Sequence, residues 1–305
     1  MEIYLPIAEM SVHWLLLLGL GGGIGFLSGL LGVGGGFLLT PLLIFTGIPS
    51  SVAVATTSSH VTASSMSGAL AQWRKGAIDL KMAALMTAGG LAGTVAGVWL
   101  FAILRRSGQM DVVVSAAYVI LLGTIGSLML RESLSTLRAA RSGTMPPRRV
   151  ERTWIHALPF KMRFPASRLY ISAIPPLGIG FLVGMLSAVL GVGGGFVVVP
   201  AMIYVLRMPA NIVMGTSLAQ IIVTTAAATV LQSVSNHAVD AMLALWLIAG
   251  GVVGAQLGVR AAARLRGEHL RLLLAVLVIF VAIRLFYGLV ATPRELFSVT
   301  MGSGS

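Results

Sequence analysis

The chain has 305 residues, of which 57% are hydrophobic and 10% charged, whereas soluble proteins have about 25% charged residues. It contains no cysteine, which excludes disulfides, thiolate metal sites and thiol nucleophiles. The net charge of +12 does not indicate a nucleic-acid partner, because nine of the 21 Lys and Arg residues lie between residues 131 and 168, as in a cytoplasmic loop. We therefore expect an all-α polytopic membrane protein without a cofactor.

Eight apolar runs are long enough to cross a bilayer, which takes about 20 helical residues. They cover residues 12–31, 51–72, 82–104, 111–130, 171–190, 210–233, 240–262 and 271–290. Two shorter runs, at 36–48 and 195–207, end at Pro49 and Pro209. As helices these two would reach only about 20 Å, so we interpret them as half-helices.

Each half-helix begins in a glycine motif that occurs twice. Gly-Val-Gly-Gly-Gly-Phe stands at residues 32–37 and again at 191–196, 159 residues later, and a proline follows each copy at the same distance. Each glycine in a helix interior costs about 1 kcal/mol relative to alanine. Both copies therefore predict a break in a membrane helix.

The two halves also match beyond the glycine motifs. Residues 55–57 correspond to 215–217, and the loop at 76–79 corresponds to 237–240. We therefore predict an internal duplication. Its parts are a first transmembrane repeat at 1–130, a basic cytoplasmic linker at 131–170, a second repeat at 171–301, and an artificial linker remnant at 302–305.

The arginines predict how the two repeats are oriented. With four crossings per half, the four arginines between 260 and 271 would lie opposite the central linker, against the positive-inside rule. If the half-helix is a fifth crossing, these arginines and Arg207 lie on the cytoplasmic side. An odd number of crossings inverts the second copy, as in many secondary transporters. We expect two inverted repeats, each with four full spans and one glycine-broken half-helix.

The doubled motif G-x-G-G-G-[FL]-x-x-x-P, followed in each half by a Thr/Ser-rich helix and a short loop with an aspartate, resembles a known family. It is similar to the TauE/SafE sulfite exporter family, also called the 4-toluene sulfonate uptake permeases. The resemblance covers about residues 14–290. It implies a bacterial plasma-membrane carrier for sulfite, sulfoacetate or other organosulfonates, with about eight spans made by duplicating four.

The glycine motifs are the first candidates for substrate binding. Successive backbone N–H groups in a glycine-rich turn can hold an oxyanion, and the N-terminus of the following helix adds partial positive charge. The candidate residues are Gly34, Gly35, Gly36, Gly193, Gly194 and Gly195. Close helix packing is the alternative, and we expect it for the pairs Gly93 with Gly97 and Gly254 with Gly258.

The helix after each motif supplies polar side chains. The candidates are Thr56, Thr57, Ser58 and His60 in the first half and Thr216, Ser217 and Gln220 in the second. The alternative is that the hydroxyls bond carbonyls of their own helix. His60 is ionisable near the middle of a span, which indicates function, unless a neighbouring threonine caps a neutral ring. Asp79 and Asp240 are candidates for a gate or an ion ligand, and helix capping is the favoured alternative.

We therefore predict a secondary transporter that moves small sulfur oxyanions across the bacterial inner membrane by alternating access, as an exporter, with the central loop cytoplasmic. The alternatives are an anion channel and a carrier of another small organic anion such as a carboxylate. An enzyme is disfavoured because the chain has no H-E-x-x-H motif and no mid-span aspartate pair. The expected partners are the anion and the lipid bilayer, and a homodimer is left open.

Overall fold

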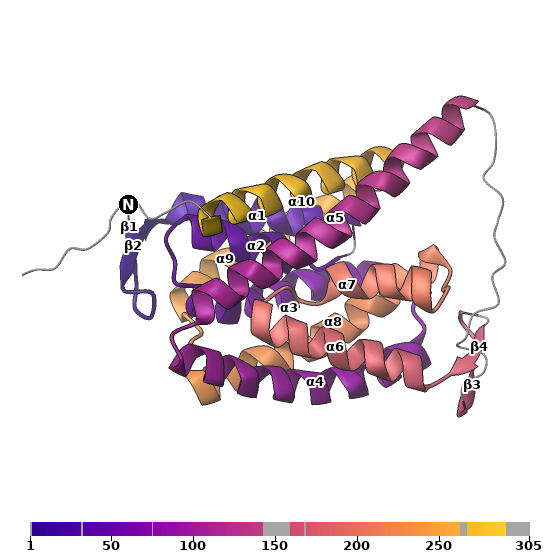
Figure 1. Cartoon of the computed structure of the whole chain (residues 1–305), viewed down its shortest axis with the longest axis horizontal. Helices are drawn as coiled ribbons and strands as arrows, with labels where there is room; N and C mark the ends of the chain where they lie inside the picture. Colours follow the sequence, from indigo (N-terminus) through magenta and orange to yellow (C-terminus); the bar gives the residue numbers. More distant parts are fainter. Residues whose placement is uncertain are drawn as a thin grey trace, which may run out of the picture.

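The computed structural model describes residues 2–31, 33–74, 76–142, 159–167, 169–262 and 267–290. The chain forms an elongated bundle of helices with a two-stranded hairpin at each end (Figure 1). The first-half helices are α1 Trp14–Leu31, α2 Gly36–Phe45, α3 Ser50–Arg74, α4 Leu80–Arg106 and α5 Met110–Ser142. The second-half helices are α6 Ile174–Leu190, α7 Gly195–Pro200, the π-helix η2 Ala201–Val205, α8 Ala210–Asn236, α9 Ala241–Ala262 and α10 Gly267–Val290.

The hairpins were not expected from the sequence. The first hairpin pairs β1 Glu2–Leu5 with β2 Met10–His13, and the second pairs β3 Lys161–Phe164 with β4 Leu169–Ser172, both antiparallel. The second hairpin lies mostly inside the range predicted as linker, whose first part continues α5. Residues 143–158 of that linker, and the predicted remnant at 302–305, lie outside the described residues.

Helices form in all eight ranges predicted as full spans. Four of them are long and apolar enough to cross a membrane by length and composition: Leu80–Arg106, Met110–Arg131, Ile212–Asn236 and Ala241–Ala261. Three further apolar helices are shorter, at Trp14–Leu30, Ile174–Leu190 and Ala275–Val290. α3 has 25 residues, but its serines and threonines make it too polar to face lipid, and most of its polar residues are buried inside the bundle. The protein is therefore membrane-embedded and mostly helical.

The helix breaks predicted from the glycine motifs are confirmed. One break separates α1 from α2 and the other separates α6 from α7. The backbone φ angles are 85° at Gly34, 66° at Gly35, 74° at Gly193 and 78° at Gly194. Only glycine adopts this left-handed region readily, so both turns depend on these residues.

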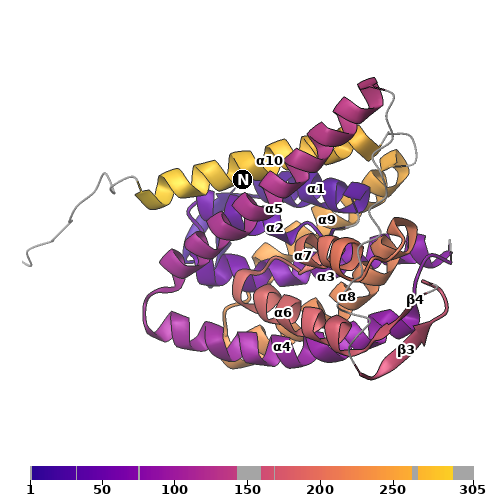
Figure 2. The same ribbon diagram turned by 45° about the vertical axis from the view of Figure 1, so that its right-hand side comes forward.

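Helices of the first half pack against helices of the second. α1 lies along α9, α4 along α6, α5 along α10, and α3 along α8 (Figure 2). Small residues allow the close approach: a Cβ added at Gly25 would clash with the backbone of Gly251, and one at Gly184 with the backbone of Gly90. Gly93, Gly97, Gly254 and Gly258 are in backbone contact in the same two interfaces, which confirms the packing predicted for them.

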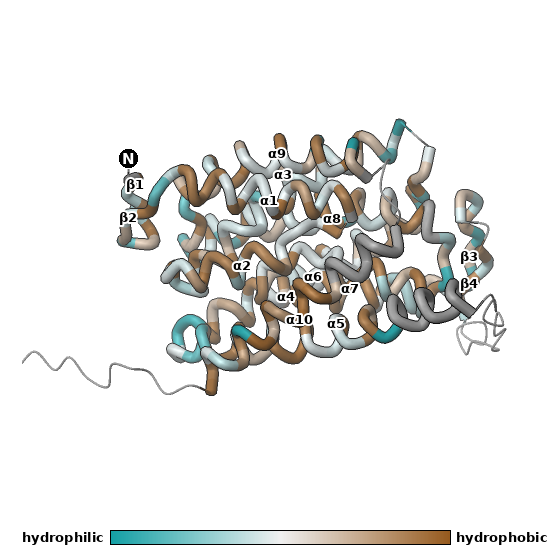
Figure 3. Tube along the Cα trace, turned by 90° about the horizontal axis from the view of Figure 1, so that it is seen from above, coloured by the Kyte–Doolittle hydropathy of each residue, from teal (hydrophilic) through white to brown (hydrophobic). Residues whose placement is uncertain are grey.

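The two hairpins mark opposite ends of the bundle (Figure 3). The first hairpin leads directly into α1, and Gly47, just after α2, lies beside Met10 of β2. α2 therefore returns to the end at which α1 begins. At the other end the second hairpin leads into α6, and its Phe164 packs in one buried cluster with Leu206 after η2. The α7–η2 segment therefore returns to the second hairpin, so each half-helix turns back after its glycine break.

Candidate functional site

The two glycine turns meet inside the bundle. A Cβ added at Gly36 would lie 2.6 Å from the carbonyl oxygen of Gly191, and one at Gly195 would clash with the carbonyl of Val33. The rings of Phe37 and Phe196 stack with their centroids 4.4 Å apart and an interplanar angle of 13°. The N-termini of α2 and of the helical segment Gly195–Val205 therefore lie together.

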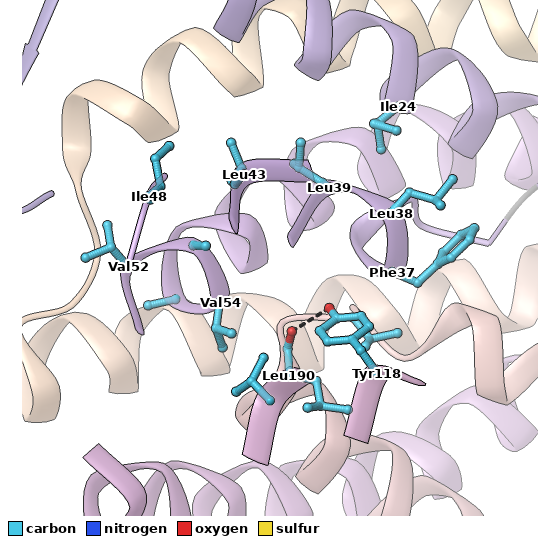
Figure 4. Close-up of a cluster of buried hydrophobic side chains, with 14 of the residues drawn as sticks. Ile24, Phe37, Leu38, Leu39, Leu43, Ile48, Val52, Val54, Tyr118 and Leu190 are labelled. Carbon is cyan, nitrogen blue, oxygen red and sulfur yellow. Dashed lines mark hydrogen bonds between the residues drawn. The ribbon is translucent and has the colours of Figure 1, made fainter. Parts of the chain in front are cut away.

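The meeting point is closed on every side in this structure. Val33 is 6% exposed, Phe37 2%, Val192 0% and Phe196 1%. Around it lie large buried side chains of α1, α2, α3 and α5, including Ile24 and Leu38 (Figure 4). The structure thus holds the glycine turns away from both ends of the bundle.

α3 and α8 form the walls beside the turns. A Cβ at Gly34 would lie 3.4 Å from Val61 Cγ1, and one at Gly195 would lie 2.9 Å from Ile221 Cδ1. The hydroxyls of Thr62 on α3 and Thr225 on α8 are 2.8 Å apart and share a hydrogen bond. A polar contact therefore joins the two central helices next to the turns.

Several buried hydroxyl and amide groups on α3, α6 and α8 have no hydrogen-bond partner among the described residues. They are Ser65 Oγ, Thr57 Oγ1, Ser187 Oγ and both amide atoms of Gln220. Ser65 Oγ lies at the first glycine turn, 3.4 Å from the position of a Cβ on Gly34, and the buried Thr40 Oγ1 lies 3.0 Å from the position of a Cβ on Gly191 at the second turn. An unsatisfied buried polar group costs about 1–3 kcal/mol. The unpaired hydroxyl and amide N–H groups could therefore donate hydrogen bonds to the acceptor atoms of a bound ligand.

Other predicted hydroxyls are already occupied. Ser58 Oγ donates to Val54 O and Ser217 Oγ donates to Met214 O, each in its own helix. This is the alternative that the sequence left open for them. Thr216 Oγ1 also donates within its own helix, to Ile212 O at 2.8 Å, and in addition accepts from Asp79 N. Thr56 Oγ1 accepts from the backbone N–H of Asp240 in a distant loop, as described below.

His60 is buried but does not face the glycine turns. Its Nε2 lies 3.3 Å from Gly21 O of α1, and a Cβ at Gly251 of α9 would clash with the ring. Its Nδ1 has no hydrogen-bond partner among the described residues. The contact is with a backbone carbonyl, so the expected alternative of a threonine cap is wrong. On α8, Gln220 similarly places its Nε2 3.3 Å from the position of a Cβ on Gly90.

Asp79 caps α4 at the end of the bundle that carries the second hairpin. Its Oδ1 accepts from Met82 N at 3.1 Å, and its Oδ2 accepts from Ser167 N at 3.1 Å and Ser167 Oγ at 2.6 Å. Its own N–H donates to Thr216 Oγ1 on α8 at 3.0 Å. Through its carboxylate and its backbone N–H, Asp79 thus joins the α3–α4 loop, the second hairpin and α8.

Asp240 has the matching arrangement at the opposite end. Its Oδ1 accepts from the first N–H groups of α9, those of Met242 and Leu243, at 3.0 and 3.1 Å. Its Oδ2 accepts from Ile7 N at 2.9 Å and Ala8 N at 3.4 Å in the first hairpin. Its N–H donates to Thr56 Oγ1 on α3 at 3.0 Å. Both aspartates are helix caps, and neither lies beside the glycine turns.

Sequence reasoning missed some residues at the turns. Val61 and Ser65 follow Thr57 at intervals of four residues, so helical spacing could have placed all three on one face of α3. Tyr118 of α5 gave no such signal, because it is a single aromatic residue in an apolar span. Its hydroxyl donates to Leu190 O at 2.6 Å and so supports the end of α6 at the second turn (Figure 4).

These features define a membrane-embedded helical protein built around two broken helices with their glycine turns sealed inside. A family model described as "Sulfite exporter TauE/SafE" matches residues 16–285, and the chain belongs to that family. The resemblance predicted from the doubled motif is confirmed.

Similar proteins carry transporter names. "Probable membrane transporter protein YjnA" of Bacillus subtilis (strain 168) is 30% identical over 266 residues, which cover 86% of this chain and 95% of the relative. A "probable membrane transporter protein" of Xylella fastidiosa (strain 9a5c) is 29% identical over 270 residues, covering 87% and 92%. No solved structure matches the chain. The family and these names indicate a membrane transporter rather than an enzyme.

Proposed function

We propose that this transporter moves a small sulfur oxyanion, such as sulfite or an organosulfonate, outward across the bacterial inner membrane by alternating access. The observation that carries the proposal is the meeting of two helix N-termini in a buried place beside the unpaired Ser65 hydroxyl. Helix N-termini and glycine-rich turns favour anions through their N–H groups and dipoles. The family supports a sulfur oxyanion as cargo.

The arrangement of the helices supports two inverted repeats. The packing of α1 on α9 has its counterpart in α6 on α4, while α3 pairs with α8 and α5 with α10. Each half has five segments that alternate in direction and begins at its own hairpin, and the hairpins lie at opposite ends. Both properties are those of an internal duplication whose second copy is inverted.

Charge supports a cytoplasmic location for the end with the second hairpin. Arg74, Arg207 and Arg260 lie at this end, whereas the loop between α8 and α9 at the other end has no Lys or Arg. Arg105 and Arg106 at the first-hairpin end are exceptions to the positive-inside rule. An inside-negative potential contributes about 2.3 kcal/mol per charge per 100 mV, which favours outward movement of an anion.

The sealed turns favour a carrier over a channel, because the described residues around them leave no open path. A carboxylate carrier would use the same donors. The experiment that separates these alternatives is uptake into proteoliposomes of sulfite, sulfate, sulfoacetate, an aryl sulfonate and acetate. Saturable uptake of a sulfur oxyanion supports the proposal. Non-saturable flux would indicate a channel, and uptake of acetate alone would indicate a carboxylate carrier.

Ser65→Ala tests the place of the site. Removing an unpaired hydroxyl leaves no protein group unsatisfied, so we expect normal folding and an affinity for the transported anion roughly ten- to hundredfold weaker, as for a lost hydrogen bond to a charged ligand. Ser64→Ala is the matched control, because Ser64 is equally buried but its hydroxyl bonds Val61 O of its own helix. Equal affinities in both variants and the parent protein would place the anion elsewhere.

A further inference from the structure

Two aspartates join segments that are far apart in the sequence, each through its carboxylate and its backbone N–H. Asp240 lies 233 residues from Ile7 and 184 residues from Thr56, yet it bonds both. We call this set, with Ala8, the first clasp. The second clasp consists of Asp79, Ser167 and Thr216, and its members are 88 and 137 residues from Asp79. Each clasp ties one hairpin, one helix-start loop and one central helix together.

The chemistry of the clasps makes them suited to opening as units. Asp240 is 0% and Asp79 1% exposed, and neither forms a hydrogen bond to a Lys or Arg among the described residues. A buried carboxylate is stable only while donors replace its water. If the hairpin donors move away, water must replace them. The loop that carries the aspartate then opens, and its carboxylate becomes exposed to water.

The clasps act on the helices that form the walls of the glycine turns. Thr56 lies five residues before Val61, and Thr216 five residues before Ile221. At 1.5 Å per residue each hydroxyl is only about 7.5 Å along the helix from a side chain that contacts the turns. A shift of α3 or α8 at a clasp therefore reaches the wall of the proposed site.

We propose that the two clasps are the gates of the transport cycle. The first clasp closes the path at the end of the first hairpin, and the second closes it at the end of the second hairpin. Both are formed in this structure, in agreement with the sealed turns. Transport requires one clasp to open while the other stays closed. This inference rests on the alternating access proposed above.

The absence of cysteine from the chain makes the test direct. Ser65→Cys places the only thiol of the protein at the glycine turns, with nearly the same volume as serine. A charged, membrane-impermeant maleimide is added to membrane vesicles of either orientation, without substrate. Thr56→Val removes the α3 contact of the first clasp, and Thr216→Val removes the α8 contact of the second. Thr94→Val is the control, because this buried hydroxyl bonds only Gly90 O of its own helix.

We expect the two clasp variants to have opposite sidedness. In the Ser65→Cys background, Thr56→Val should raise the labelling rate of the introduced thiol roughly two- to tenfold from the first-hairpin side only, as expected for one lost hydrogen bond. Thr216→Val should do so from the other side only, and Thr94→Val from neither. Ser167→Ala, which keeps the Ser167 N–H contact, is a milder second variant if Thr216→Val fails to fold.

Equal changes on both sides, or no change in folded variants, would show that the clasps are helix caps without a gating role. Labelling requires no substrate, so its result does not depend on which anion the protein carries. If the variants change labelling from one side only but the protein takes up no sulfur oxyanion, the proposed cargo is wrong and the proposed gates are supported. If the protein takes up a sulfur oxyanion but the variants change labelling equally from both sides, or not at all, the proposed gates are wrong and the proposed cargo is supported.

Discussion

The surroundings of α3 and α8 share one backbone plan but differ in their side chains. His60 of α3 fits against Gly251 of α9, and Gln220 of α8 fits against Gly90 of α4. An imidazole can take up a proton, whereas an amide cannot. The comparison teaches that α3 and α8 each place a polar side chain against a glycine of a neighbouring helix, while these two side chains need not have the same role.

The largest effect is expected where the two halves are most alike. Phe37→Ala and Phe196→Ala each remove one ring of the buried stack between the turns. Loss of a buried phenylalanine costs about 3–5 kcal/mol, so we expect a large and similar fall in the Tm of the purified protein for both variants. Unequal losses would show that one turn depends on the stack more than the other. The exposed Phe280→Ala is the control.

A smaller effect is expected at the two glycines that face His60 and Gln220. Gly251→Ala directs its new methyl group into the imidazole ring, whereas Gly90→Ala meets the terminal methyl group of Thr224. Overpacking costs about 1–3 kcal/mol. We expect the greater loss of Tm for Gly251→Ala, because its methyl group meets several ring atoms of His60, whereas at Gly90 only Thr224 Cγ2 lies within 3.0 Å.

The double variant tests the cause of that difference. His60→Gln in the Gly251→Ala background should recover part of the lost stability, since the flexible amide then replaces the ring. His60→Gln in the parent protein should lower the Tm only slightly, because the Gln220 amide already fits beside Gly90 at the corresponding place in the other half. If His60→Gln gave no recovery, the methyl group would be in conflict with the α1–α9 backbone instead.

The smallest effect is expected at the second turn alone. Tyr118→Phe removes the hydroxyl that donates to Leu190 O and leaves a buried carbonyl with one partner fewer. Such a loss costs about 1 kcal/mol. Tyr287→Phe, at a residue that is 67% exposed, is the control. A lower Tm for Tyr118→Phe alone would show that the hydroxyl supports the second turn, and an unchanged Tm would show that packing suffices.

The sequence predicted those parts of the structure that local chemistry determines. Glycine runs do not continue a helix, so both breaks were predictable, and the position of Asp79 before a helix favoured the cap that the structure shows. The helical ranges followed from apolar length. The number of spans did not. The apolar helices at Trp14–Leu30, Ile174–Leu190 and Ala275–Val290 are shorter than a span, and α3 is long enough but has hydroxyls that require protein rather than lipid around them.

The contacts between segments could not be read from the sequence. Nothing in either glycine motif predicts that Gly36 contacts Gly191 of the other motif, far away in the sequence. A run of Ser and Thr does not reveal which hydroxyl bonds its own helix, which bonds a loop and which stays unpaired. Thr57, Ser58 and Thr56 are neighbours in the chain, but the structure gives them these three different environments.

The pairing of α1 with α9 and of α4 with α6 has a consequence for biosynthesis. α1 and α6, the first long helices of the two halves, each pack closely against a helix of the other half. When the ribosome has completed α5, the glycine-rich faces of α1 and α4 still have no partner. Until α6 and α9 have been synthesised, we therefore expect lipid or the insertion machinery to cover these faces of α1 and α4. We therefore expect that a chain that stops at the linker lacks the partners of α1 and α4 and does not form a complete core.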